Sequence, residues 1–152
     1  MRLLPLVLVL FSFSINSCSE NGCKPVRPDV EEPQMLAFAS TNGITATKHQ
    51  SGLYYQILNP GSGVTPTLSS KVYVTYVGKH MDGTVFDQTN TVVSFFLSDL
   101  LEGWKIGLPL IRKGGHILLI VPSSLAYGCS STSGAMPPNS ILYFDIQLID
   151  VQ

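Results

Sequence analysis

Aromatic side chains are the residues of this 152-residue chain best suited to form a functional site. Serines are plentiful, but the chain has no GxSxG motif, and its stretch PGSG lacks the lysine and the following helix of a phosphate-binding loop. The histidines are isolated, so no Cys/His spacing is typical of a metal site. What remains is a set of aromatic residues near the ends of expected strands: Tyr76, Phe86, Phe95, Trp104, Tyr127 and Phe144. Such rings can line an apolar pocket, although a single aromatic residue is more often part of the core.

Asp87 is the acidic residue of most interest, because it follows Phe86 directly in the stretch TYVGKHMDGTVFDQT (75–89). Composition alone favours a solvated charge at a strand end. The alternative is a carboxylate held against an apolar pocket. No second carboxylate is paired with Asp87 in a way that the sequence reveals, so acid–base catalysis by two carboxylates is not indicated.

Strand signals dominate from Ser51 onward and would position these side chains. The pair Asp82-Gly83 predicts a tight hairpin turn between two of the strands. The stretch HILLIVP (116–122) is apolar on both faces of the expected strand, so we expect it to be covered on both sides. The expected strands are 52–58, 71–78, 84–88, 91–98, 116–122 and 140–151.

One helix is predicted within SDLLEGWKIGLPLIRKGG (98–115), where leucine and tryptophan recur at helical spacing. Ser98 or Asp99 would be the N-cap, and Gly114-Gly115 would end the helix. Pro109 lacks a backbone donor and should shorten or bend the last turn. The resulting fold class is α+β, with a curved antiparallel sheet of about five to six strands and one short helix on its face.

The first residues of the chain suggest export. Charged residues make up 12% of the chain and the net charge is −1, so nothing indicates nucleic-acid binding. Residues 1–17 resemble a signal peptide of the lipoprotein type, with an apolar run too short to span a bilayer. Cys18 would then be lipidated and would anchor the protein to a bacterial membrane, facing the periplasm. The alternative is an ordinary cleaved signal with an incidental cysteine.

Residues 18–50 are predicted to form a tether with a possible short helix in EEPQMLAFASTNG (31–43), which leaves 51–152 as the folded domain. Export would permit a disulfide between Cys23 and Cys129. The sequence does not show whether their Cα atoms come close enough for a disulfide, and we expect both thiols to be free.

Four stretches in this order resemble the FKBP-type peptidyl-prolyl cis-trans isomerases, above all the lipoprotein-like members of Gram-negative bacteria. They are VTYVGKHMDGTVFDQT, VSFFLSDLLEGWKIGLPLIRKGG, VPSSLAYG and MPPNSILYFDIQLIDV, and the match runs from Gly52 to the C-terminus. The resemblance implies a sheet wrapped around one short helix, with a pocket between them.

The resemblance also implies roles for individual residues. Trp104 would form the pocket floor, and the backbone N–H of Leu101 would bind a substrate carbonyl. Tyr127 would offer its hydroxyl from the rim, and Asp87 would lie at the pocket edge, partly buried and hydrogen-bonded to Tyr76 or Tyr127. Val93 stands where many members have phenylalanine, and Ala135 where a larger aliphatic is common. The implied substrate-binding set is Tyr76, Phe86, Val93, Leu100, Trp104 and Phe144, with Asp87, Leu101 and Tyr127 as catalytic residues.

The activity implied is rotation about X–Pro amide bonds in exported proteins, without metal or cofactor, to assist their folding. An apolar pocket would favour the twisted amide, which has lost its resonance, over the planar one. The partners would be unfolded or partly folded proteins that contain proline, with macrolides as possible inhibitors. Two other hypotheses remain open: a chaperone module that binds proline-containing peptides with low activity, and a lipid-tethered structural domain.

Overall fold

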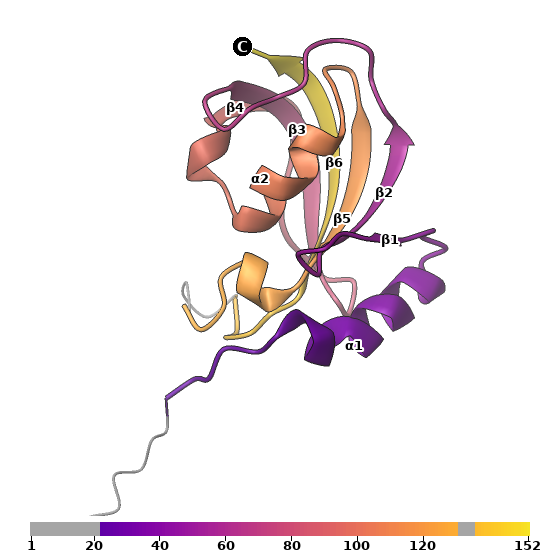
Figure 1. The fold of residues 1–152 in the computed structure, drawn as a ribbon, viewed down its shortest axis with the longest axis vertical. Helices are drawn as coiled ribbons and strands as arrows, with labels where there is room; N and C mark the ends of the chain where they lie inside the picture. The colour runs from indigo at the N-terminus through magenta and orange to yellow at the C-terminus, as the bar shows by residue number, and fades with distance from the viewer. Residues whose placement is uncertain (1–21, 131–135) are drawn as a thin grey trace, which may run out of the picture.

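The computed structural model describes residues 22–130 and 136–152 of the chain. Its main feature is one antiparallel sheet of six strands, in the order β1-β2-β5-β6-β3-β4 (Figure 1). The sheet is curved, and the short helix α2 (Glu102–Gly107) packs on one of its faces, so the predicted α+β fold is confirmed. The strands are β1 (Thr47–Lys48), β2 (Tyr54–Asn59), β3 (Lys71–His80), β4 (Val85–Phe96), β5 (His116–Val121) and β6 (Leu142–Val151).

The sheet face that contacts α2 holds the larger part of the core. Strand alternation along β6 buries every second side chain on this face: Leu142, Phe144, Ile146 and Leu148. Gly103 lets α2 approach β5 closely, because a Cβ at this position would lie only 2.5 Å from Cγ1 of Val121. The glycine therefore fixes the height of the helix above the sheet.

β5 is covered on both faces, as its uninterrupted apolar sequence predicts. Ile117 and Leu119 pack in the core beneath α2. Leu118 and Ile120 point to the opposite face and pack in a second cluster with residues of the helix α1 (Pro28–Thr41). The sheet is thus sandwiched between two unequal layers.

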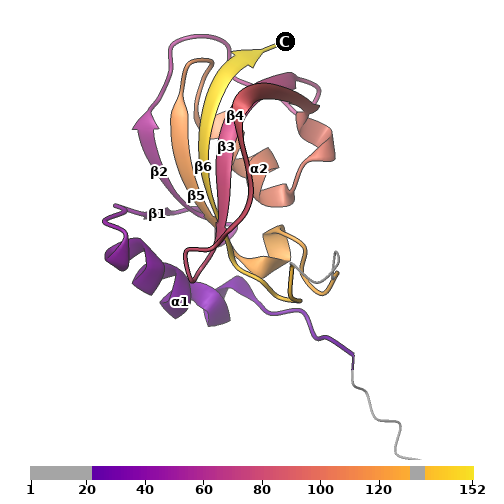
Figure 2. The same ribbon diagram turned by 180° about the vertical axis from the view of Figure 1, so that it is seen from behind.

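The helix α1 lies at the end of the sheet where β5 finishes and β6 begins (Figures 1 and 2). It starts at Pro28 rather than at residue 31, because a proline in the first turn loses no helical hydrogen bond. Met35 and Phe38 are buried against the sheet, and the ring centroid of Phe38 lies 5.2 Å from that of Tyr143. Much of the segment expected as a tether is therefore packed on the sheet.

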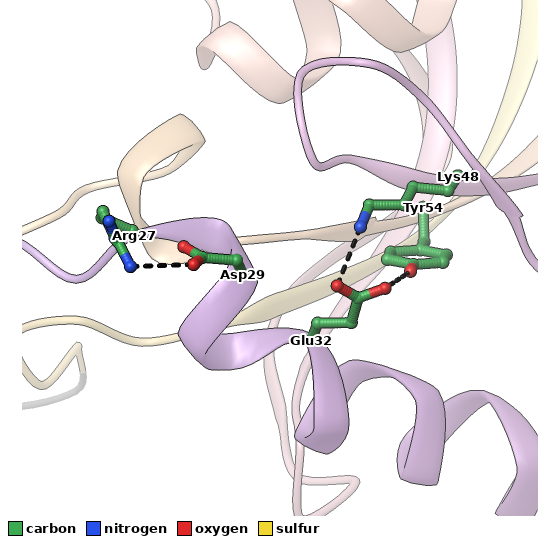
Figure 3. Close-up of polar contacts among 5 residues, drawn as sticks. All are labelled: Arg27, Asp29, Glu32, Lys48 and Tyr54. Atoms are coloured by element: carbon green, nitrogen blue, oxygen red, sulfur yellow. Dashed lines mark hydrogen bonds and ion pairs between the residues drawn. The ribbon is translucent and has the colours of Figure 1, made fainter.

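Glu32 ties α1 to the β1–β2 edge of the sheet (Figure 3). Its carboxylate accepts a hydrogen bond from the Lys48 ammonium at 2.8 Å and another from the Tyr54 hydroxyl. These hydrogen bonds, that from Lys48 first, lower the pKa of Glu32. The neighbouring pair of Arg27 and Asp29 is largely exposed, so it adds little to stability.

The stretches 84–88 and 91–98, which were expected as separate strands, belong to the single strand β4 over Val85–Phe96, and the last two residues of the second stretch lie beyond it. The two predictions differ from the structure because β4 contains an irregularity in its pairing with β3. Val74 pairs with Val93, whereas Tyr76 pairs with Thr89, so β4 uses more residues than β3 over the same interval. The extra residues form a bulge, which an edge strand tolerates because its outer side has no partner strand.

The helix predicted over 98–115 is shorter than expected, and the predicted N-cap is wrong. Ser98 and Asp99 belong to a separate 3-10 turn (Leu97–Asp99), and Leu100 is extended, so α2 begins only after Leu101. The predicted effect of Pro109 is found: α2 gives way to a 3-10 turn at Leu108–Leu110.

Cys23 and Cys129 form a disulfide, so the expectation of two free thiols is wrong. Their Cα atoms are 5.6 Å apart although 106 positions separate them in the sequence. The bond forms because the packing of α1 directs the segment before it along the loop that follows β5. Sequence spacing carried no information on this approach.

Several expectations fall outside the described residues, namely the signal peptide (1–17), the lipidated Cys18 and the position of Ala135. Within residues 22–130 and 136–152, no helix combines the length and the apolar character needed to span a bilayer.

Candidate active site

A cavity of 190 Å³ opens between the sheet and the start of α2. Its lining contains one charged group and otherwise aromatic or leucine side chains: Tyr76, Phe86, Asp87, Phe95, Leu100, Leu101, Trp104, Tyr127 and Phe144. A larger hollow of 410 Å³ lies beside α1 and the β3–β4 hairpin, but none of these aromatic residues lines it. The cavity therefore gathers the aromatic residues that the sequence singled out.

Trp104 lines the cavity and is only 4% exposed. Its ring lies edge-on to Tyr76 and to Phe144, with centroid distances of 5.3 Å in both pairs. Phe86 packs edge-on to Phe144 at 5.7 Å. Edge-to-face contacts are a favoured arrangement of aromatic rings, so the rings support one another without a substrate.

Gly78 allows two of these rings to close over β3. A Cβ at this position would lie 2.7 Å from Cζ of Phe86 and 3.1 Å from Cε1 of Phe144. A larger residue would push the rings apart and open the cavity wall. The glycine in YVGKH is thus a packing requirement of the site.

Leu101 occupies the N-cap position of α2, and its carbonyl accepts the N–H groups of Trp104 and Lys105 at 2.9 and 3.0 Å. Its own N–H has no hydrogen-bond partner among the described residues. Leu101 is also one of the residues that line the cavity.

Asp87 is hydrogen-bonded as expected but is not buried. The Tyr76 hydroxyl donates to its Oδ2 at 2.6 Å. The expectation of partial burial is wrong, because β4 is an edge strand and leaves the carboxylate open to water. Burial of its ring, and next the bond to Asp87, raise the pKa of Tyr76 well above its usual value. The Tyr76 hydroxyl therefore stays protonated and holds Asp87 at the rim.

Val93 does not line the cavity, contrary to the prediction. It pairs with Val74 and packs against the core. Phe95 lines the cavity instead; it was among the aromatic residues singled out in the sequence but was not assigned to the substrate-binding set. Period-two alternation along β4 was the signal that could have found it, because Phe95 shares a face with Val93 and has a longer side chain.

Tyr127 follows a 3-10 turn (Ser123–Leu125) in the loop after β5. It is half-buried, and its hydroxyl makes no hydrogen bond within the described residues.

The described residues contain no group of three or more His, Cys, Asp or Glu side chains that could hold a metal ion. The site offers an apolar surface with hydroxyl and N–H donors at its edges.

Comparison with known proteins agrees with this geometry. Residues 63–149 match the family model described as FKBP-type peptidyl-prolyl cis-trans isomerase. The isomerase FkpA of Escherichia coli is 42% identical over 118 residues, which cover 76% of this chain and 43% of that protein. The outer membrane protein MIP of Legionella longbeachae is 41% identical over 105 residues, which cover 67% of this chain and 45% of that protein.

Solved structures give the same result. A peptidyl-prolyl cis-trans isomerase of Pseudomonas syringae aligns with a TM-score of 0.72 and 30% identity, covering 83% of this chain and 93% of that one. The crystal structure of FkpA from Escherichia coli aligns with a TM-score of 0.71 and 35% identity, covering 83% and 61%. The chain spans about half the length, or less, of the curated relatives that it matches. It belongs to the FKBP-type peptidyl-prolyl cis-trans isomerase family.

Proposed function

We propose that this chain catalyses cis–trans rotation about X–Pro amide bonds in unfolded or partly folded proteins. The observation that carries the proposal is the apolar cavity around Trp104, with the Leu101 N–H and the Tyr127 hydroxyl at its edges. Its 190 Å³ is below the roughly 300–1,000 Å³ of sites that enclose drug-sized ligands. A cavity of this size suits a single side chain such as the proline ring.

The reaction needs no nucleophile and no proton transfer. The barrier to rotation is about 18–20 kcal/mol, because the planar amide is stabilised by resonance. In the twisted amide this resonance is lost, so the charge separation across the bond is smaller. An apolar cavity that removes water from the bond therefore disfavours the planar state more than the twisted state. Every ~1.4 kcal/mol of this difference accelerates rotation about tenfold.

The donors at the cavity edge would fix the substrate backbone. The Leu101 N–H would bind the carbonyl on one side of the proline, and the Tyr127 hydroxyl would bind a second acceptor of the peptide. Asp87 would accept the hydrogen bond from the Tyr76 hydroxyl and so would hold the Tyr76 ring at one rim of the cavity. The exposure of its carboxylate supports a role in orienting this rim and shaping the electric field there, rather than in proton transfer.

The proposal is tested with a protease-coupled assay on a chromogenic peptide that contains proline. Trp104→Leu keeps an apolar side chain but removes the ring between Tyr76 and Phe144, so we expect a large loss of kcat/KM. Phe96→Leu is the matched control, because Phe96 is 53% exposed and does not line the cavity. A wild-type rate no higher than the uncatalysed rate would refute the isomerase proposal, and peptide binding without turnover would favour the chaperone alternative.

We propose further that the protein is exported and anchored through a lipid on Cys18. Two observations support export: the Cys23–Cys129 disulfide is typical of oxidising compartments, and one relative is described as an outer membrane protein. The anchor is tested by cell fractionation of Cys18→Ser. If this variant were processed and membrane-bound like the wild type, the lipid anchor would be excluded.

A further inference from the structure

The position of Tyr127 depends on the backbone of one buried residue, Ser123. The Ser123 carbonyl accepts the N–H of Ala126 at 3.0 Å and the N–H of Gly128 at 2.8 Å, so it holds the residues on both sides of Tyr127. Ser123 is fully buried, whereas the Tyr127 side chain reaches the cavity. Any shift of Ser123 therefore moves Tyr127 with it. We refer to residues 122–130 as the Tyr127 turn.

Ser123 is itself held by a carboxylate from α1. Its backbone N–H donates to Oε2 of Glu31 at 2.8 Å, across 92 positions of sequence. Glu31 is only 7% exposed, and it forms no ion pair within the described part of the chain. A buried carboxylate is costly unless it is hydrogen-bonded, and a bond between an ionised acceptor and an N–H is among the stronger ones. The contact therefore specifies where α1 and the Tyr127 turn meet.

The segment before α1 holds the same turn on its other side. Cys23 is bonded to Cys129, two positions after Tyr127. The Asn139 side chain donates to the Lys24 carbonyl at 2.9 Å, and the Asn139 N–H donates to the Gly128 carbonyl at 2.7 Å. Figures 1 and 2 show this segment running beside the turn. The Tyr127 turn is thus held before Tyr127 by Glu31 and after it by Cys23, and both residues precede the family match at 63–149.

We propose that Glu31 is a positioning residue for the isomerase reaction, which sets the place of the Tyr127 hydroxyl through the backbone of Ser123. The proposal rests on the proposed function, in which Tyr127 binds the substrate. Glu31 itself does not line the cavity, so it acts only through the turn. In this way α1 contributes to the active site without touching the substrate.

The test is a double-mutant cycle on the full chain, with Glu31→Ala, Tyr127→Phe and the double variant in the proline-peptide assay. We expect Glu31→Ala to lower kcat/KM about tenfold, within the loss of up to about 10²-fold that a 1 Å misplacement can cause. In the Tyr127→Phe background the same substitution should have almost no further effect. Equal losses in both backgrounds, or no loss from Tyr127→Phe alone, would overturn the proposal.

Conservative and control variants separate positioning from general destabilisation. Glu31→Gln retains an oxygen that can accept the Ser123 N–H, so it should restore most of the activity. Glu31→Asp keeps the charge but shortens the reach, so it should lose activity only when Tyr127 is present; it replaces Glu31→Ala in the cycle if that variant does not fold. Glu32→Ala is the matched control, because Glu32 is the next residue of α1 and its carboxylate is hydrogen-bonded to Lys48 and Tyr54 of the β1–β2 edge. A loss from Glu32→Ala as large as that from Glu31→Ala would contradict the proposal.

Amide hydrogen exchange gives a readout that does not depend on turnover. Glu31→Ala should raise exchange at Ser123 and at Ala126 while leaving the protection of α2 unchanged. Unchanged exchange at Ser123 would overturn the proposal. A wild-type chain without isomerase activity would instead refute the proposed function, and the exchange result would still decide whether Glu31 holds the turn.

Discussion

The Cys23–Cys129 disulfide should contribute measurably to the stability of the chain. It closes a loop across 106 positions, and a loop of about 100 residues corresponds to about 4.7 kcal/mol in the chain-entropy treatment of the unfolded state. Part of this gain is offset in the native state, because residues 22–27, which precede α1, form no helix or strand and regain freedom when the bond is absent. We expect the free energy of unfolding to fall by about 2–4 kcal/mol when the bond is removed.

The measurement is urea unfolding of the wild type and of the double variant Cys23→Ser/Cys129→Ser, each with and without a reductant. With a slope of about 2 kcal/mol/M, which is typical of urea, the midpoint should fall by about 1–2 M in the variant. The reduced wild type should match the variant, and the reductant should not affect the variant. The slope should also rise without the bond, because the unfolded chain is no longer held compact. Identical midpoints for the oxidised wild type and the variant would refute this reasoning.

Three further predictions follow, two on the cavity and one on the opposite face of the sheet. Phe95→Leu should lower kcat/KM in the proline-peptide assay more than Phe96→Leu, because only Phe95 lines the cavity; equal effects would remove Phe95 from the site. Asp87→Leu should lower turnover while costing less than about 1 kcal/mol of stability in urea, because the carboxylate is exposed, and unchanged turnover would make Asp87 an ordinary surface charge. Burial of the ring, and then the charge of Asp145, raise the pKa of Tyr143 to about 12, above the value of about 10 for an unfolded chain. The stability linked to Tyr143 is therefore complete below about pH 10 and is lost as the pH rises toward 12; Tyr143→Phe should remove part of that fall, and identical profiles would contradict the assignment.

The sequence predicted most where local rules act on consecutive residues. Alternation along residues 140–151 and the apolar run at 116–122 correctly indicated β6 and β5, because a sheet covered on one or both faces imposes these patterns directly. The aromatic residues could be assigned to one pocket only through their order and spacing in the family motifs. No local rule says that rings far apart in sequence will meet.

The predictions that failed depend on contacts between distant segments. The exposure of Asp87 follows from the place of β4 at the sheet edge, which is a property of the strand order. The bulge that sets the register around Val93 arises from pairing with β3 and leaves no clear mark on the sequence of β4. The disulfide and the contact between Glu31 and Ser123 both depend on the packing of α1 against the sheet.

The docking of α1 explains why composition was misleading for the segment before the domain. A helix that covers only one end of a sheet needs few apolar residues, and Met35, Phe38 and Ala39 are sufficient because all three are buried. The rest of the helix can remain polar and resemble a tether. One polar residue of the helix, Glu31, is buried and accepts a hydrogen bond from the Ser123 N–H, four positions before Tyr127. A polar segment can thus carry specific structural information through a small number of residues whose partners lie far along the chain.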